Sequence, residues 1–94
     1  MEGGKEMRQG YFTVATPFGA MFLDVRSTSS IGTYLASIDG MFDVEEVKKI
    51  LGLQEDTDSE LEKKLKDGVY LTEDQLVQIL KHDPSAKRHF RDWQ

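Results

Sequence analysis

Two short segments that alternate between hydrophobic and polar residues constrain the fold more than any other feature of the chain. Residues 11–16 and 20–26 alternate with a period of two, which is typical of strands with one buried face. Residues 16–19, Thr-Pro-Phe-Gly, connect them, and this sequence suits a tight turn. The pattern therefore predicts a β-hairpin. One face of the hairpin is expected to enter the core and carries Phe12, Val14, Met21, Leu23 and Val25.

The opposite face of the predicted hairpin is mixed in character. Its residues are Tyr11, Thr13, Ala15, Phe22, Asp24 and Arg26. Because polar and aromatic side chains alternate there, we expect this face to remain in contact with water or to be covered only in part. The alternative is that helices of the same chain cover Tyr11 and Phe22.

The segment after the hairpin, residues 27–40, fits a short helix. Residues 27–30 are all serine or threonine, whose hydroxyls act as N-caps by accepting hydrogen bonds from free backbone amides. Gly40 is a natural helix stop. The hydrophobic residues at helical spacing between these ends are Ile31, Tyr34, Leu35 and Ile38. Gly32 and Thr33 weaken a helix, so a third strand over residues 32–38 is the alternative.

Capping signals mark further short helices in the second half of the chain. Three capping boxes are present, and their pairs are Asp43 with Glu46, Thr57 with Glu60, and Thr72 with Gln75. Asp83 and Pro84 end the third of these helices and begin another, because proline disfavours a helix before it and suits the first helical position. The hydrophobic stripe of the last helix is Ala86, Phe90 and Trp93.

These elements predict an α+β fold. The N-terminal β-hairpin packs against four or five short helices, and residues 69–71 can add a third short strand. Since 94 residues with a hydrophobic share of 38% suffice for one small core, residues 10–94 are expected to form a single domain. Residues 1–9 are expected to form a flexible N-terminal arm.

The net charge of −5 is unevenly distributed. Residues 43–74 contain eleven acidic and five basic residues, a local charge of −6, whereas residues 81–94 carry +2. An acidic chain binds phosphate backbones poorly, so nucleic acid is not expected as a partner. The chain has no cysteine and no apolar run of about 18 residues, and its first ten residues are polar. We therefore expect a cytoplasmic protein without a membrane partner.

The reactive residues form no recognised catalytic pattern. No serine lies in a Gly-x-Ser-x-Gly elbow, and residues 56–67 fail as a calcium loop because the sixth position is leucine. His82, His89 and Asp92 permit at most a weak metal site. The sequence thus predicts no enzyme, no cofactor and no metal, and a small metal-dependent or hydrolytic enzyme using these three residues is the most distant alternative.

Function is therefore expected to lie on the surface. We expect a protein-binding or regulatory module, in an accessory or inhibitory role such as those of phage proteins. Exposed aromatic residues on a hairpin are typical anchors for another protein or for a homodimer. The acidic residues after position 54 are a second candidate surface. The predicted protein-binding residues are Tyr11, Phe22, Glu55, Asp56, Asp58 and Glu60.

The C-terminal segment offers a rival interpretation. Residues 72–94 read as helix, break and helix, which superficially resembles a helix-turn-helix. In that alternative the chain is a nucleic-acid-binding regulator. The residues that would contact phosphates are Lys81, Lys87, Arg88 and Arg91.

Overall fold

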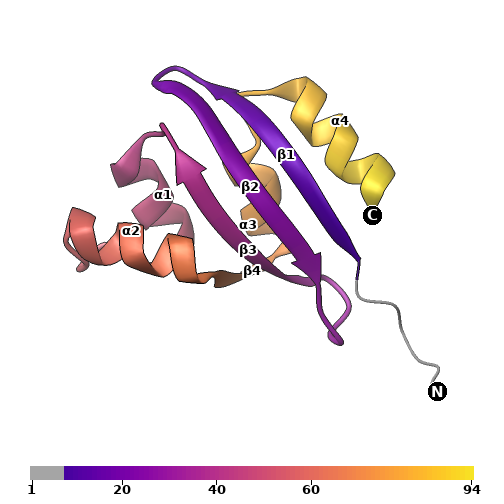
Figure 1. The fold of residues 1–94 in the computed structure, drawn as a ribbon, viewed down its shortest axis with the longest axis horizontal. Helices are drawn as coiled ribbons and strands as arrows, with labels where there is room; N and C mark the ends of the chain where they lie inside the picture. Colours follow the sequence, from indigo (N-terminus) through magenta and orange to yellow (C-terminus); the bar gives the residue numbers. More distant parts are fainter. Residues whose placement is uncertain (1–7) are drawn as a thin grey trace.

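The sheet has four antiparallel strands in the order β1-β2-β3-β4. The structure is a computed structural model that describes residues 8–94 (Figure 1). The strands are β1 (Gln9–Thr16), β2 (Gly19–Ser27), β3 (Thr33–Gly40) and β4 (Val69–Thr72). The helices are α1 (Val44–Leu51), α2 (Asp58–Asp67), α3 (Glu73–Ile79) and α4 (Pro84–Trp93). The expected α+β class is thus confirmed, with four strands and four helices in residues 8–94.

The predicted hairpin is formed by β1 and β2. Its register pairs Thr16 with Gly19, and the Thr16 hydroxyl donates to the Gly19 carbonyl at 2.7 Å while accepting from the Phe18 N–H at 3.1 Å. All five residues predicted to face the core are at most 3% exposed. Two residues at the end of the predicted arm are placed: Gln9 belongs to β1, and the Arg8 backbone pairs with Ser27. The rest of the predicted arm, residues 1–7, lies outside the described residues.

The predicted helix over residues 27–40 is wrong, and the alternative of a third strand over residues 32–38 is confirmed, because Thr33–Gly40 forms β3. Tyr34, Ala36 and Ile38 alternate with period two and are buried, whereas Ile31 from the expected helical stripe is 94% exposed. The apolar residues of this segment fit both periods, and pairing with β2 over seven residue pairs decides between them. Gly40 ends the strand with φ at +92°, and a Cβ there would collide with the Ala20 carbonyl oxygen.

The hydroxyl residues before β3 stabilise a turn rather than a helix. The Thr28 hydroxyl lies 3.1 Å from the Ser30 carbonyl and 2.9 Å from the Thr33 carbonyl, and it accepts from the Ser30 N–H. The Thr33 N–H donates back to the Ser30 carbonyl at 3.1 Å. Short hydroxyl side chains cap turns by the same bonds that cap helices, so composition alone does not separate the two.

The extended piece predicted near residue 70 is β4, and it pairs with β3 rather than with the hairpin. Helices α1 and α2 form the connection between β3 and β4. The Thr57 and Thr72 capping boxes are present as predicted. At α1 the predicted box is only half formed: Asp43 accepts from the Glu46 N–H at 3.3 Å, but the Glu46 carboxylate pairs with Lys81 and His82.

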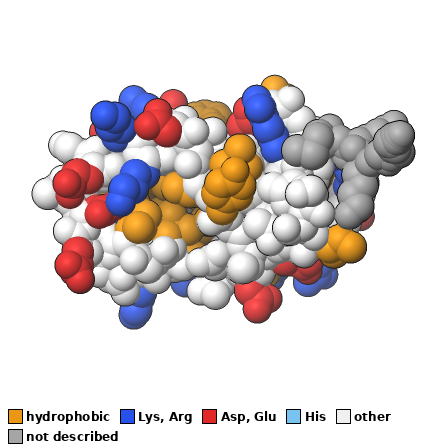
Figure 2. Space-filling view, turned by 90° about the horizontal axis from the view of Figure 1, so that it is seen from below, with side chains coloured by type: hydrophobic (Ala, Val, Ile, Leu, Met, Phe, Trp, Pro, Cys, Tyr) orange, Lys and Arg blue, Asp and Glu red, His pale blue; other side chains and the backbone are white. Residues whose placement is uncertain are grey.

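The helices cover one face of the sheet (Figure 1). In the view from below, some hydrophobic side chains remain at the surface among charged side chains of both signs (Figure 2). Buried side chains from the inner faces of all four strands meet Leu61 and Leu65 of α2 and Leu76 and Ile79 of α3. Helix α4 packs against β1, where the Phe90 ring lies 6.1 Å from the Phe12 ring and 5.4 Å from the Tyr34 ring between centroids. Among residues 8–94, no helix is both long enough and apolar enough to cross a membrane.

Candidate protein-binding face

The face of the sheet opposite the helices carries three exposed aromatic side chains. Tyr11 on β1 is 68% exposed, Phe22 on β2 is 51% exposed, and Tyr70 on β4 is 71% exposed. They result from the same alternation that sends their neighbours into the core. The alternative that helices of the chain cover Tyr11 and Phe22 is therefore wrong. We call this surface the open face.

A groove of about 270 Å³ crosses the open face between β1, β2 and β3. The register places Tyr11 opposite Asp24 and Phe22 opposite Thr13, so the two rings lie diagonally on neighbouring strands. On β3, Ser37 lies beside Asp24 and Asp39 lies beside Phe22. The groove is lined by Tyr11, Phe22, Leu23, Asp24, Ser37, Ile38, Asp39 and Lys66.

The groove holds two carboxylates against one ammonium group. Asp24 accepts two hydrogen bonds from the Gln9 amide nitrogen, at 2.9 and 3.1 Å, and lies 4.0 Å from Arg26. Asp39 accepts from the Gly40 N–H at 2.8 Å. Lys66, from the last turn of α2, makes no ion pair within residues 8–94. The groove thus combines aromatic walls with carboxylate oxygens that retain free lone pairs.

The second predicted surface, residues 55–60, is largely engaged within the chain. Asp56 pairs with Lys64 at 2.7 Å and Asp58 pairs with Lys48 at 2.8 Å. Glu60 completes the Thr57 capping box by accepting from the Thr57 N–H at 2.8 Å. The Asp58 carboxylate raises the pKa of the Lys48 ammonium. Glu55 is exposed and takes part in no ion pair of the described chain.

Of the four basic residues predicted to contact phosphates, Lys81 pairs with a residue of α1 and the other three lie on α4. Lys81 pairs with Glu46 at 2.7 Å, and this contact, together with His82, lowers the pKa of the Glu46 carboxyl. On α4, Lys87 is half-buried and Arg88 and Arg91 are exposed. Because α4 packs on β1 through Ala86 and Phe90, its basic side chains point away from the core.

Asp83 fixes the start of α4 against the sheet. One carboxylate oxygen accepts from the Ser85 and Ala86 N–H groups at 3.1 and 3.2 Å, and the other accepts from the Ala15 N–H at 2.9 Å. The Ala15 bond is the main cause that lowers the pKa of Asp83. Ala15 lies on β1, an outer strand of the sheet, so Asp83 also occupies a backbone donor at this edge.

The two histidines lie in separate environments. His82 Nε2 lies 3.2 Å from a Glu46 carboxylate oxygen, whereas the His89 ring centroid lies 4.7 Å from that of Phe12. In residues 8–94 no three His, Asp or Glu side chains gather closely enough to hold a metal ion. The structure therefore does not bring His82, His89 and Asp92 together.

Six residues that line the groove were not singled out for binding by the sequence, and three of these carry a charge: Asp24, Asp39 and Lys66. The alternation placed Asp24 on the correct face, which was the available signal. Asp39 was hidden because its segment was interpreted as a helix. Lys66 reaches the groove from α2, and no local pattern reports where the end of α2 meets the sheet.

Comparison of the chain with protein-family models, with curated protein sequences and with solved structures finds no match.

Proposed function

We propose that the protein is a non-catalytic binding module whose open face binds a positively charged segment of another protein. The observation that carries this proposal is the groove in which Tyr11 and Phe22 stand exposed beside Asp24 and Asp39. Large aromatic side chains are the usual anchors of protein interfaces. Because folding of this chain does not bury these side chains, their exposure on one face of the sheet favours a surface that a partner covers.

The chemistry of the groove favours a cationic side chain as its occupant. An ammonium or guanidinium group is attracted to the faces of aromatic rings, by about 0.5–1 kcal/mol at an exposed site. Two carboxylates and one ammonium group, that of Lys66, line the groove, while Arg26 pairs with Asp24 at 4.0 Å from outside the lining. The whole chain has a net charge of −5. Rings and carboxylates thus act on the same cation, and the overall charge speeds its approach.

On each outer strand of the sheet one backbone N–H group is already occupied by a side chain, which favours recognition through the face over addition of a strand. On β1 the Ala15 N–H is occupied by Asp83, and on β4 the Thr72 N–H donates to the Gln75 side-chain oxygen at 2.8 Å. Strand addition needs a row of free backbone groups. This argument also weakens a homodimer formed through the edges.

The test uses two short fluorescein-labelled peptides of equal length, one of alternating lysine and glycine and one of alternating glutamate and glycine. Fluorescence anisotropy is expected to show saturable binding of the lysine peptide alone, weakened by added salt. Phe22→Ser and Asp39→Asn are each expected to weaken it at least about fivefold, the factor that corresponds to losing an interface anchor.

Two matched controls separate the groove from other surfaces. Phe18→Ser removes an exposed aromatic residue from the β1–β2 turn, and Glu55→Gln removes an exposed acid from the α1–α2 connection. Both are expected to bind as the wild type does. If the lysine peptide does not bind, or if the controls weaken binding as much as the groove variants, the proposal is wrong.

A further inference from the structure

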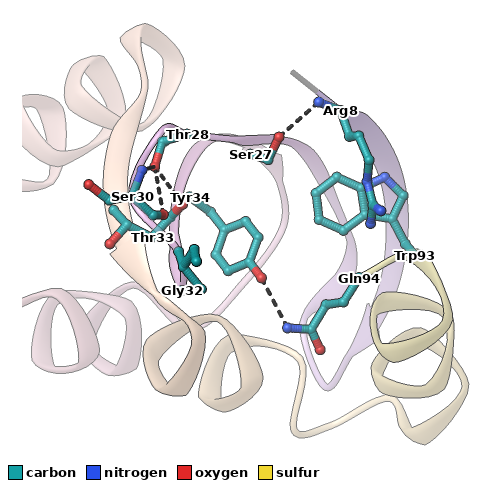
Figure 3. Close-up of a pocket in the computed structure, with 10 residues that line it drawn as sticks. Arg8, Ser27, Thr28, Ser30, Gly32, Thr33, Tyr34, Trp93 and Gln94 are labelled. Atoms are coloured by element: carbon teal, nitrogen blue, oxygen red, sulfur yellow. Dashed lines mark hydrogen bonds between the residues drawn. The ribbon is translucent and has the colours of Figure 1, made fainter. Parts of the chain in front are cut away.

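A second hollow, of about 450 Å³, lies between the β2–β3 turn and the last turn of α4 (Figure 3). The turn contributes hydroxyl residues, and α4 contributes Trp93 and Gln94. Arg8, at the entry to β1, completes the wall beside Trp93. This hollow is separate from the groove of the open face, since the two share no lining residue.

Arg8 is held in place by its backbone and by an aromatic ring. Its N–H donates to the Ser27 hydroxyl at 2.8 Å, and its carbonyl accepts from the Ser27 N–H at 2.9 Å. Its guanidinium carbon lies 5.1 Å from the Trp93 ring centroid. No Asp or Glu of residues 8–94 forms an ion pair with Arg8. The guanidinium therefore retains donors for a ligand.

Hydroxyl groups around the hollow also keep protons to donate. The Ser27 hydroxyl accepts from the Arg8 N–H, and the Tyr34 hydroxyl accepts from the Gln94 side-chain nitrogen at 3.0 Å (Figure 3). A hydroxyl that accepts one hydrogen bond still has its own O–H. The hollow therefore combines a cation held against a ring with O–H donors on neighbouring elements.

The hollow also lacks acidic side chains. Four other hollows formed by residues 8–94 are each lined by at least one Asp or Glu side chain, whereas no such side chain lines this one. We propose that it binds a small molecule through an oxyanion group, a carboxylate or a phosphate. Because the last carbonyls of α4 carry partial negative charge, the anion is expected on the Ser27 side of Arg8, away from the helix end.

The test titrates the isotope-labelled protein with sodium phosphate and, separately, with sodium acetate, at an ionic strength held constant with sodium chloride. Amide signals of Ser27 and Thr28 and the Trp93 indole signal are expected to shift saturably with at least one anion. The anion that binds more tightly identifies the source of the oxyanion. Arg8→Ala is expected to weaken binding more than tenfold, because hydrogen bonds to charged groups are the stronger ones.

Two further variants make the outcome decisive. Arg88→Ala removes an exposed arginine of α4 that does not line the hollow, and it is expected to leave binding unchanged. Ser30→Asp places a carboxylate in the hollow at an exposed turn position and is expected to abolish binding while Arg8 is retained. The proposal is overturned if neither anion gives saturable shifts, or if Arg8→Ala and Ser30→Asp proteins bind as tightly as the wild type.

Discussion

Replacement of Phe90 tests whether α4 is held on the sheet by its aromatic contacts. Phe90 is 0% exposed, and its ring centroid lies 6.1 Å from that of Phe12, 5.4 Å from Tyr34 and 5.9 Å from Trp93. Phe90→Ala removes the buried ring and leaves a cavity, at a cost of about 3–5 kcal/mol of unfolding free energy. Phe90→Leu keeps most of the apolar volume and loses the ring pairs, at a cost of about 1–2 kcal/mol.

Urea denaturation measures these losses with two probes. Trp93 is the only tryptophan and packs beside Phe90, so its fluorescence reports on α4, while circular dichroism reports on the whole chain. With an m-value of about 1 kcal/mol per molar urea, the loss of about 3–5 kcal/mol in the alanine variant is expected to lower the midpoint by about 3–5 M or to unfold the protein. Phe18→Ala, at an exposed turn residue, is the control and is expected to change stability by less than about 0.5 kcal/mol. A loss below about 1 kcal/mol for Phe90→Ala would refute the packing of α4 described above.

Three further predictions concern the sheet and its edge. The pKa of Asp83 is lowered in the folded state, so the ionised carboxylate stabilises the folded protein. This contribution is complete above the unfolded pKa of about 3.9 and is lost as the pH falls through the folded pKa. Asp83→Asn is therefore expected to flatten the decrease of the melting temperature at acidic pH, measured by thermal melting at a series of pH values. Gly40→Ala is expected to cost about 1–3 kcal/mol because of its positive φ and the collision with Ala20, measured by urea denaturation against Gly52→Ala, which has a positive φ but open space and costs about 1 kcal/mol. Ile31→Ser is expected to change stability by less than about 0.5 kcal/mol, a result opposite to what a buried helical stripe would give.

Local patterns were sufficient for the elements that each carry their own boundary signals. The hairpin followed from two alternating segments around a Pro-Phe-Gly turn, and α2 and α3 followed from their capping boxes. These features depend on residues close together in the chain, so a single sequence contains them in full.

Local patterns failed at β3 because two periods competed. Tyr34 and Ile38 belong both to a helical stripe and to the buried row of a strand, and only pairing with β2 and β4 selects the strand. The candidate site was predictable to the same extent. Tyr11 and Phe22 were found from alternation, whereas Asp39 and Lys66 join them only through strand register and the position of α2.

The one-sided sheet separates the residues that fold the chain from those that meet its surroundings. Substitutions at Tyr11, Phe22 or Tyr70 leave the buried rows of the same strands untouched, because neighbouring residues of a strand point to opposite faces. Selection can therefore alter recognition at these positions while the scaffold is preserved, and an engineer can randomise them as a library without redesigning the hydrophobic interior.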